Sequence, residues 1–108
     1  MAADLPTAAR WGHRMAARLA VFESLDVVRP TRLSVFSDRI EVTRRYGSVT
    51  RTRRIDYEAL SSVEVIDAKG STSVVMVDEF GVVPVPLMGR SDASKARALI
   101  EGLRKPGS

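Results

Sequence analysis

The arginines of one short segment are the side chains in this sequence with the clearest capacity for chemistry. Five arginines lie among the fifteen residues 41–55, which read EVTRRYGSVTRTRRI. A guanidinium group stays protonated and presents a fork of N–H donors that matches carboxylate and phosphate groups. The alternating pattern around Gly47 and Ser48 predicts a β-hairpin with a two-residue turn of type II′. The arrangement of that hairpin decides which arginines are available for a ligand.

One face of this hairpin is expected to be solvated and internally balanced. With the turn at Gly47-Ser48, the numbers of directly opposed residues sum to 95. Opposite charges and matched threonines are then favourable cross-strand neighbours. The face carries the pairs Arg39 with Asp56, Glu41 with Arg54, Thr43 with Thr52 and Arg45 with Thr50.

The other face begins apolar, at Ile40 and Ile55, and becomes basic toward the turn. Arg44 lies directly opposite Arg51, and opposed like charges are unfavourable unless something neutralises them. The hairpin is therefore expected to project beyond the core, with a tip that attracts anions. The candidate anion- or partner-binding residues are Arg44, Tyr46, Arg51 and Arg53.

Three interpretations of this basic tip are open from the sequence. The arginine stems can pack over the sheet edge with their heads in water, a purely structural role. They can bind an anionic ligand, or they can meet an acidic protein partner. A loop one residue longer would exchange the two faces of the hairpin.

The charge of the chain is uneven and rich in arginine. Residues 1–54 hold 11 basic and 5 acidic residues, whereas residues 55–108 hold 6 and 8, which together give the net charge of +4. Acidic residues are interspersed, and only Trp11 and Tyr46 are expected to stack on bases, so nucleic acid is an unlikely partner. The 108 residues suffice for one domain with one core.

Catalytic constellations are missing from the sequence. The chain has no cysteine and a single histidine, His13, which leaves little for a nucleophilic triad or a metal site. Asp78 and Glu79 are adjacent, so on a strand they point apart and cannot act as a paired acid and base. The glycines are separated turn glycines rather than a phosphate-binding loop. We expect no enzyme, no cofactor, no metal and no small-molecule substrate.

The elements that must position the hairpin are mainly strands. A period of two begins at Leu33, and turn signals punctuate it. Strands are expected at 32–37, 39–46, 49–56, 60–67, 72–79 and 82–87, connected as an antiparallel meander.

The last predicted strand and the last helix carry the clearest edge and capping signals. Pro84 and Pro86 lie two apart, which predicts an edge strand whose core-facing residues are Val83, Val85 and Leu87. Residues 92–104 are expected to form an amphipathic helix that is capped by Ser91 or Asp92 and lies across one open end of the sheet.

A second helix is predicted at residues 7–25, outside the β region. Its apolar stripe and bordering arginines suggest an interaction helix, and three placements are open: on its own domain, on a neighbouring protomer or on a membrane surface. The interaction residues are Arg10, Trp11, Arg14, Met15, Arg18, Leu19 and Phe22.

The segment RIDYEALSSVEV, residues 54–65, resembles the bacterial PH-like (pleckstrin-homology-like) domain family. LSVFSDRIEVTRR before it and SDASKARALIEGL near the end resemble the opening strands and the closing helix of that family. The likeness covers residues 32–104 and rests on patterns of low specificity. It implies two roughly orthogonal antiparallel sheets with a capping helix, and a non-enzymatic binding module. The family has seven strands where six are predicted, and Val27-Val28 is a candidate for the seventh.

The sequence therefore predicts a mainly β protein with an N-terminal amphipathic helix and connection at 1–30 and a PH-like barrel at 31–108. Its expected function is protein interaction or self-assembly, with a possible homo-oligomer, through the helix and the hairpin. The alternative is peripheral attachment to anionic membrane lipid. No segment approaches the length of a membrane span, and the start lacks the pattern of a secretory signal. We expect a cytoplasmic location, with the inner face of the membrane as a further possibility.

Overall fold

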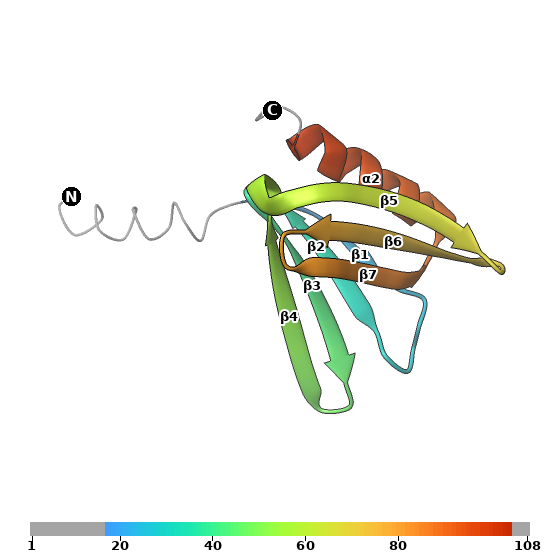
Figure 1. The fold of residues 1–108 in the computed structure, drawn as a ribbon. Coiled ribbons are helices and arrows are strands. Elements are labelled where there is room, and N and C mark those ends of the chain that lie inside the picture. The colour runs from blue at the N-terminus through green and yellow to red at the C-terminus, as the bar shows by residue number, and fades with distance from the viewer. Residues whose placement is uncertain (1–16, 105–108) are drawn as a thin grey trace.

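The fold is mainly β, with two antiparallel sheets and one C-terminal helix (Figure 1). A computed structural model describes residues 17–104. The elements in chain order are β1 (Arg18–Glu23), β2 (Thr31–Phe36), β3 (Arg39–Tyr46), β4 (Val49–Asp56), the short 3-10 helix η1 (Tyr57–Ala59), β5 (Leu60–Ala68), β6 (Ser71–Asp78), β7 (Gly81–Met88) and α2 (Arg90–Arg104). The six predicted strands are confirmed to within one residue at every end.

The first sheet has the order β1-β2-β3-β4 and contains the arginine-rich hairpin. Strands β3 and β4 pair from Arg39 opposite Asp56 to Tyr46 opposite Val49, which confirms the predicted register. Gly47 has a φ of +62°, and Ser48 has no positive φ. A positive φ at the first turn residue alone is the pattern of a type II′ turn, which fits the right-handed twist of the strands.

The second sheet has the order β5-β6-β7, and β7 is its edge strand. Val83 and Val85 are buried as predicted. The prediction for Leu87 is wrong, since its side chain is 40% exposed. The pairing of β6 with β7 shifts between Thr72 and Val74, and Leu87 has a φ of +56°. This irregularity breaks the alternation, so Met88 rather than Leu87 contributes to the core.

The connection from β4 to β5 is not a hairpin, so the predicted single meander is divided into two sheets. Helix η1 lies at this corner, where the Tyr57 hydroxyl donates a hydrogen bond of 2.6 Å to the Phe36 carbonyl. Burial, together with the nearby Asp38 carboxylate, raises the pKa of Tyr57 to about 12. Tyr57 therefore keeps its proton and holds the corner to the end of β2.

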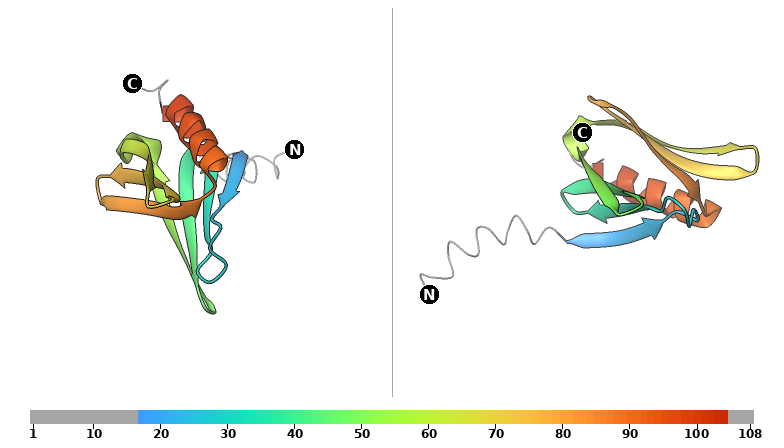
Figure 2. Two further views of the ribbon diagram at one scale, coloured as in Figure 1. Left: turned by 90° about the vertical axis from the view of Figure 1, so that its right-hand side faces the viewer. Right: turned by 90° about the horizontal axis from the view of Figure 1, so that it is seen from below.

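Helix α2 closes the space between the two sheets. Figure 2 shows α2 lying between them, and it packs on β5, β6 and η1. Its buried residues are Ala93, Ala96 and Ile100, which lie on one face of the amphipathic helix. Ala93 N–H donates to the Gly89 carbonyl at 2.8 Å, so the helix begins before the predicted caps Ser91 and Asp92.

The predicted helix at 7–25 is wrong where the structure describes the chain. Arg18, Leu19 and Phe22 lie on strand β1, which pairs with β2. Phe22 faces the core, while Leu19 is 47% exposed. The 3- and 4-residue spacing of apolar side chains in this segment competes with an alternation of two, and pairing with β2 decides between them. Arg10, Trp11, Arg14 and Met15 lie outside the described residues.

Strand β1 also replaces the seventh strand that was suggested at Val27-Val28. These two residues lie in the β1–β2 loop, residues 24–30, and are 91% and 78% exposed. The loop is shaped by Asp26, whose carboxylate accepts the N–H groups of Val28 and Arg29 at 2.9 and 3.1 Å. The first sheet therefore begins well before residue 31.

We expect Ile100→Ala to destabilise the fold strongly, because Ile100 is fully buried and belongs to the hydrophobic core. A large-to-small change in a core costs about 2–5 kcal/mol of unfolding free energy. Urea denaturation measures this cost. Ala98→Ser on the exposed side of α2 is the control, and an equal loss in both variants would contradict the packing of the helix described here.

Candidate functional site

On the outer face of the β3–β4 hairpin, Arg39 and Arg54 are held in ion pairs, and Arg45 donates a hydrogen bond to the Gly47 carbonyl. Arg39 contacts Asp38 at 2.9 Å and Glu41 at 2.7 Å, and its guanidinium carbon lies 4.1 Å from the centre of the Phe36 ring. The hydrogen bond that Arg39 donates to Glu41 raises the pKa of Arg39 despite its partial burial. The Arg39 guanidinium group is therefore occupied by neighbouring side chains, and its role is to stabilise the sheet.

Further pairs lie on the same face. Arg54 contacts Asp56 at 2.8 Å, and the hydroxyl oxygens of Thr43 and Thr52 are 3.1 Å apart. The predicted opposition of charges is present, but the ion pairs of Arg39 and Arg54 run along each strand rather than across it. Residues two apart on one strand share a face, so these contacts remain within reach.

On the inner face, Arg53 links the two sheets. Its Nη2 donates a hydrogen bond of 2.7 Å to Oδ1 of Asp78, at the end of β6. The Asp78 side chain is only 1% exposed, whereas that of Arg53 is 34% exposed. Nη1 of Arg53 is buried and has no hydrogen-bond partner among residues 17–104. Arg53 thus offers a fixed, incompletely used guanidinium group.

Asp78 also shapes the turn that follows it. The same oxygen accepts the Phe80 N–H at 2.9 Å. Burial of the Asp78 carboxylate raises its pKa, but the hydrogen bonds from Arg53 and from the backbone of Phe80 and Gly81 outweigh burial and leave the pKa below its ordinary value. Asp78 is therefore charged in the folded protein at neutral pH.

Arg44 reaches the same strand pair from farther along the hairpin. Its Nη2 donates a hydrogen bond to the Pro84 carbonyl on the outer edge of β7. Proline has no N–H group, so this edge can accept hydrogen bonds but cannot donate them at residue 84. The contact fixes the Arg44 side chain across the gap between hairpin and β7.

Together these residues line a groove of about 320 Å³ between the inner face of the hairpin and the edge of β7. We call it the hairpin groove. Its cationic side chains are Arg44, Arg51 and Arg53, and its apolar walls are Val42, Val82, Val83 and Pro84. The structure thus brings the four predicted residues together, because Tyr46 lines the groove as well.

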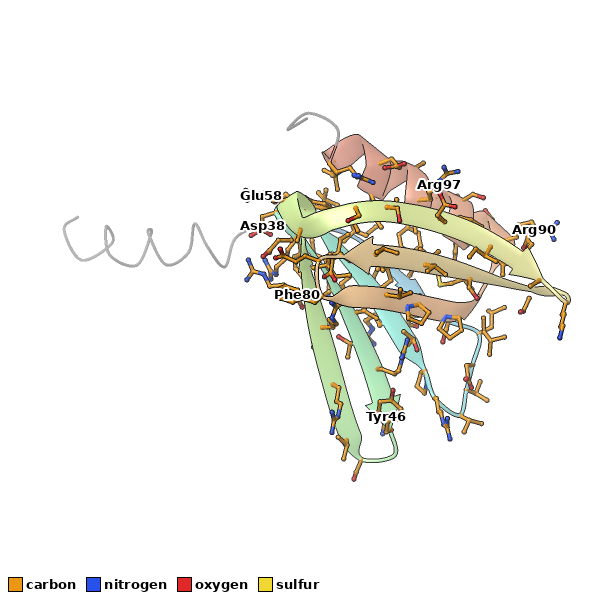
Figure 3. The ribbon with its side chains drawn as sticks, in the orientation of Figure 1. Asp38, Tyr46, Glu58, Phe80, Arg90 and Arg97 are labelled. Atoms are coloured by element: carbon orange, nitrogen blue, oxygen red, sulfur yellow. The ribbon has the colours of Figure 1, made fainter. Side chains whose placement is uncertain are left out.

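The tip of the hairpin carries a second, smaller set of exposed groups. Tyr46 and Val49 are directly opposed and are 43% and 52% exposed. With Arg51 they line a concave surface that we call the tip pocket. Within residues 17–104, Arg51 has no ion-pair or hydrogen-bond partner. Figure 3 shows Tyr46 near the end of β3, well away from the turn that carries Phe80.

Sequence reasoning missed the residues that the second sheet contributes to the site. The sequence pattern indicates only that Asp78 and Glu79 cannot act as a catalytic pair and that Pro84 lies on an edge strand. Phe80, at the β6–β7 turn, is 80% exposed. A large aromatic residue between an acidic residue and a glycine at a turn was a signal that could have indicated this exposure.

The described residues show no sign of a metal centre or a membrane-spanning helix. No group of three or more histidine, aspartate or glutamate side chains in residues 17–104 is arranged to hold a metal ion. No helix in that range is long and apolar enough to cross a bilayer. Comparison with known proteins gives no assignment either, since no family model and no curated protein matches the chain.

We expect Asp78→Asn to lower the free energy of unfolding by about 1–3 kcal/mol, since the variant loses a buried, charge-assisted hydrogen bond. The pH dependence follows from linkage. A folded-state pKa below the ordinary value of about 3.9 means that the Asp78 contribution is present above that pH and is lost as the pH falls below it.

Thermal melting between neutral and acidic pH measures both effects. The variant is expected to lose part of the acid sensitivity of the wild-type protein. Asp56→Asn is the matched control, because its carboxylate is in an exposed ion pair whose removal costs at most about 1 kcal/mol. Equal effects of the two substitutions would contradict the structural role of Asp78.

Proposed function

We propose that this protein is a non-catalytic binding module that captures an acidic segment of a protein partner in the hairpin groove. The main observation behind this proposal is that two arginine side chains are held in place by hydrogen bonds. Arg44 donates to the neutral Pro84 carbonyl, and Arg53 donates to the buried Asp78 carboxylate. Their positions are set before a ligand arrives, which reduces the entropy lost on binding.

The fold supports a binding role. A four-stranded and a three-stranded antiparallel sheet with a C-terminal helix are the parts of a PH-like domain, and Figure 1 shows the strands of the two sheets crossing steeply. We infer membership of the bacterial PH-like family from this arrangement together with the sequence resemblance. A fold does not define a function, so the proposal rests on the groove itself.

The lining of the groove favours a protein segment over a bare anion. Carboxylates can accept from the guanidinium groups of Arg44 and Arg51, while Val42, Val82 and Pro84 can cover apolar side chains. A bare phosphate would use the arginines alone and leave the apolar walls in water. Aromatic and arginine side chains with an apolar floor are also typical of the central part of a protein interface.

We expect Arg51→Thr to weaken binding of poly-L-glutamate about two- to fivefold, the loss typical of one exposed ionic contact. The effect should shrink at high salt, because screening reduces such contacts. Fluorescence anisotropy with labelled poly-L-glutamate measures it. Stability should hold or rise slightly, since the variant also relieves the opposition of Arg44 and Arg51.

Arg45→Thr is the matched control. Arg45 lies one residue from Arg44 on the outer face, and its Nε donates to the Gly47 carbonyl at 3.1 Å. The two variants have the same net charge and differ only in the face that loses an arginine. Equal weakening in both would show attraction to net charge alone and would exclude the groove as the binding site.

Attachment to anionic membrane lipid is the second candidate, and one observation favours it. Leu25, Val27 and Val28 in the β1–β2 loop are 71%, 91% and 78% exposed, and Arg29 follows them. Figure 1 shows this loop and the hairpin tip projecting in the same general direction from the body of the fold. Apolar side chains next to a cation suit the interface of an anionic bilayer.

For this candidate we expect Val27→Asp with Val28→Asp to abolish co-sedimentation with vesicles of phosphatidylcholine and phosphatidylserine, since two charges would enter the lipid interface. Poly-L-glutamate binding should be unchanged. Wild-type protein that stays in the supernatant with these vesicles would exclude the membrane candidate and leave the protein partner.

A further inference from the structure

We propose that the acidic segment bound at the hairpin is the β6–β7 turn, residues 78–81, of a second copy of this chain. The inference rests on the proposed function and names the occupant, which would bind at the outer end of the hairpin groove, where the groove shares Tyr46 and Arg51 with the tip pocket. Glu79 of one copy would pair with Arg51 of the next, and Phe80 would enter the tip pocket between Tyr46 and Val49.

The β6–β7 turn has the form of a rigid projecting anchor. Asp78 pairs with Gly81 across a two-residue loop, so Glu79 and Phe80 form its apex. Side chains at such an apex cannot reach the core, and Phe80 is accordingly 80% exposed. The hydrogen bond from Phe80 N–H to Asp78, itself held by Arg53, fixes the turn. A rigid exposed aromatic residue is a favourable interface anchor.

The charges of the turn and the tip pocket are complementary. Glu79 has no ion-pair or hydrogen-bond partner in the part of the chain that the structure describes, and Arg51 has none there either. Tyr46 and Val49 form an apolar surface beside the Arg51 guanidinium, against which the Phe80 ring of a second copy could pack. A single segment can therefore supply a carboxylate to Arg51 and cover the exposed side chains of Tyr46 and Val49.

The β1–β2 loop is a poorer occupant, although it exposes more apolar surface. The Asp26 carboxylate is used by two N–H groups of its own loop, and Glu23 pairs with Arg32 at 3.0 Å. Arg29 would bring a further positive charge toward Arg51. Among the exposed apolar segments of residues 17–104, the β6–β7 turn is the one with an available carboxylate at its apex.

The two halves of the contact lie apart on one molecule. Arg53 and Asp78 join the turn to the base of the hairpin, while Tyr46 and Val49 lie at its tip. The rows Val42–Arg53 and Tyr46–Val49 are four residues apart along the strand, or about 13 Å. Figure 3 shows Phe80 beside the base of the hairpin and Tyr46 near its tip.

This separation favours head-to-tail contact over a twofold dimer. A twofold axis that exchanges base and tip would pass near the row Arg44–Arg51, and would bring four arginines from two copies together. Opposed like charges disfavour that arrangement. A heterologous contact uses the turn of one copy and the tip pocket of the next, and it leaves one free site at each end.

The test uses two variants of the full chain that each remove one half of the contact. Glu79→Lys with Phe80→Ser removes the anchor, and Arg51→Thr removes the cation of the tip pocket without adding a carboxylate that could attract the lysine introduced in the other variant. Sedimentation velocity and light scattering over a wide concentration range give the mass. Because the contact is small, the wild-type mass is expected to rise only at high protein concentration, and less so at high salt.

Each variant alone is expected to remain monomeric. An equimolar mixture is expected to form a dimer with about twice the monomer mass and nothing larger, because each variant supplies the half that the other lacks. Glu64→Lys and Arg97→Thr are the matched controls, since both residues are exposed and lie on β5 and α2. These controls are expected to assemble like the wild type.

Three results would overturn the inference: a wild-type chain that is monomeric throughout, variants that assemble like the wild type, or a mixture that stays monomeric. Poly-L-glutamate binding by the same samples keeps this decision separate from the proposed function. A monomeric chain that still loses poly-L-glutamate on Arg51→Thr has an acidic partner other than itself. A monomeric chain without such binding overturns both proposals.

Discussion

The hydrogen-bonded ion pair between Arg53 and Asp78 is the interaction on which the candidate site depends. It joins the hairpin of the first sheet to the end of β6 in the second. The Asp78 side chain is buried, so its charge requires a partner, and Arg53 supplies one together with two backbone N–H groups. The same oxygen sets the β6–β7 turn. One carboxylate thus holds the hairpin to the end of β6 and shapes the turn at which Phe80 is exposed.

The edges of the sheets are protected by different means. Pro84 and Pro86 remove donors from the edge of β7, and Arg44 occupies the carbonyl of Pro84. Strand β4 carries three arginines and ends in Asp56, and charged side chains discourage pairing with another chain. Association at this face must therefore use side chains, since a new strand cannot be added at β7. This constraint is consistent with the proposed contact, in which the tip pocket binds side chains of the β6–β7 turn.

Local patterns predicted most of the fold. Alternation and turn residues located β2 to β7, and a glycine first in a two-residue turn was enough to determine the pairing of Arg44 with Arg51. The apolar spacing of residues 18–23 fits both a helix and a strand, so the helix prediction is wrong there. Only the pairing of this segment with β2 distinguishes the two. Leu87 was misplaced because a β-bulge has no reliable signal in a single sequence.

Only the part of the candidate site that lies within the β3–β4 hairpin could be predicted from the sequence. The sequence separated the balanced face of the hairpin from the basic one, since both strands of that hairpin are adjacent in the chain. The contributions of Asp78 and Pro84 come from residues 25 and 40 positions away from their arginine partners. Contacts of that separation depend on how the two sheets fold onto each other, which no local period encodes.

The opposed pair of Arg44 and Arg51 is the part of the site that stability does not explain. Arg53 stabilises Asp78, and Arg39 and Arg54 have carboxylates beside them. Arg51 has none within residues 17–104, and it faces a second guanidinium across the strand. A threonine pair of the kind found at Thr43 and Thr52 would avoid that repulsion and keep the sheet propensity. An acidic group placed between the two arginines would offset their repulsion, and the proposed acidic segment would supply that group.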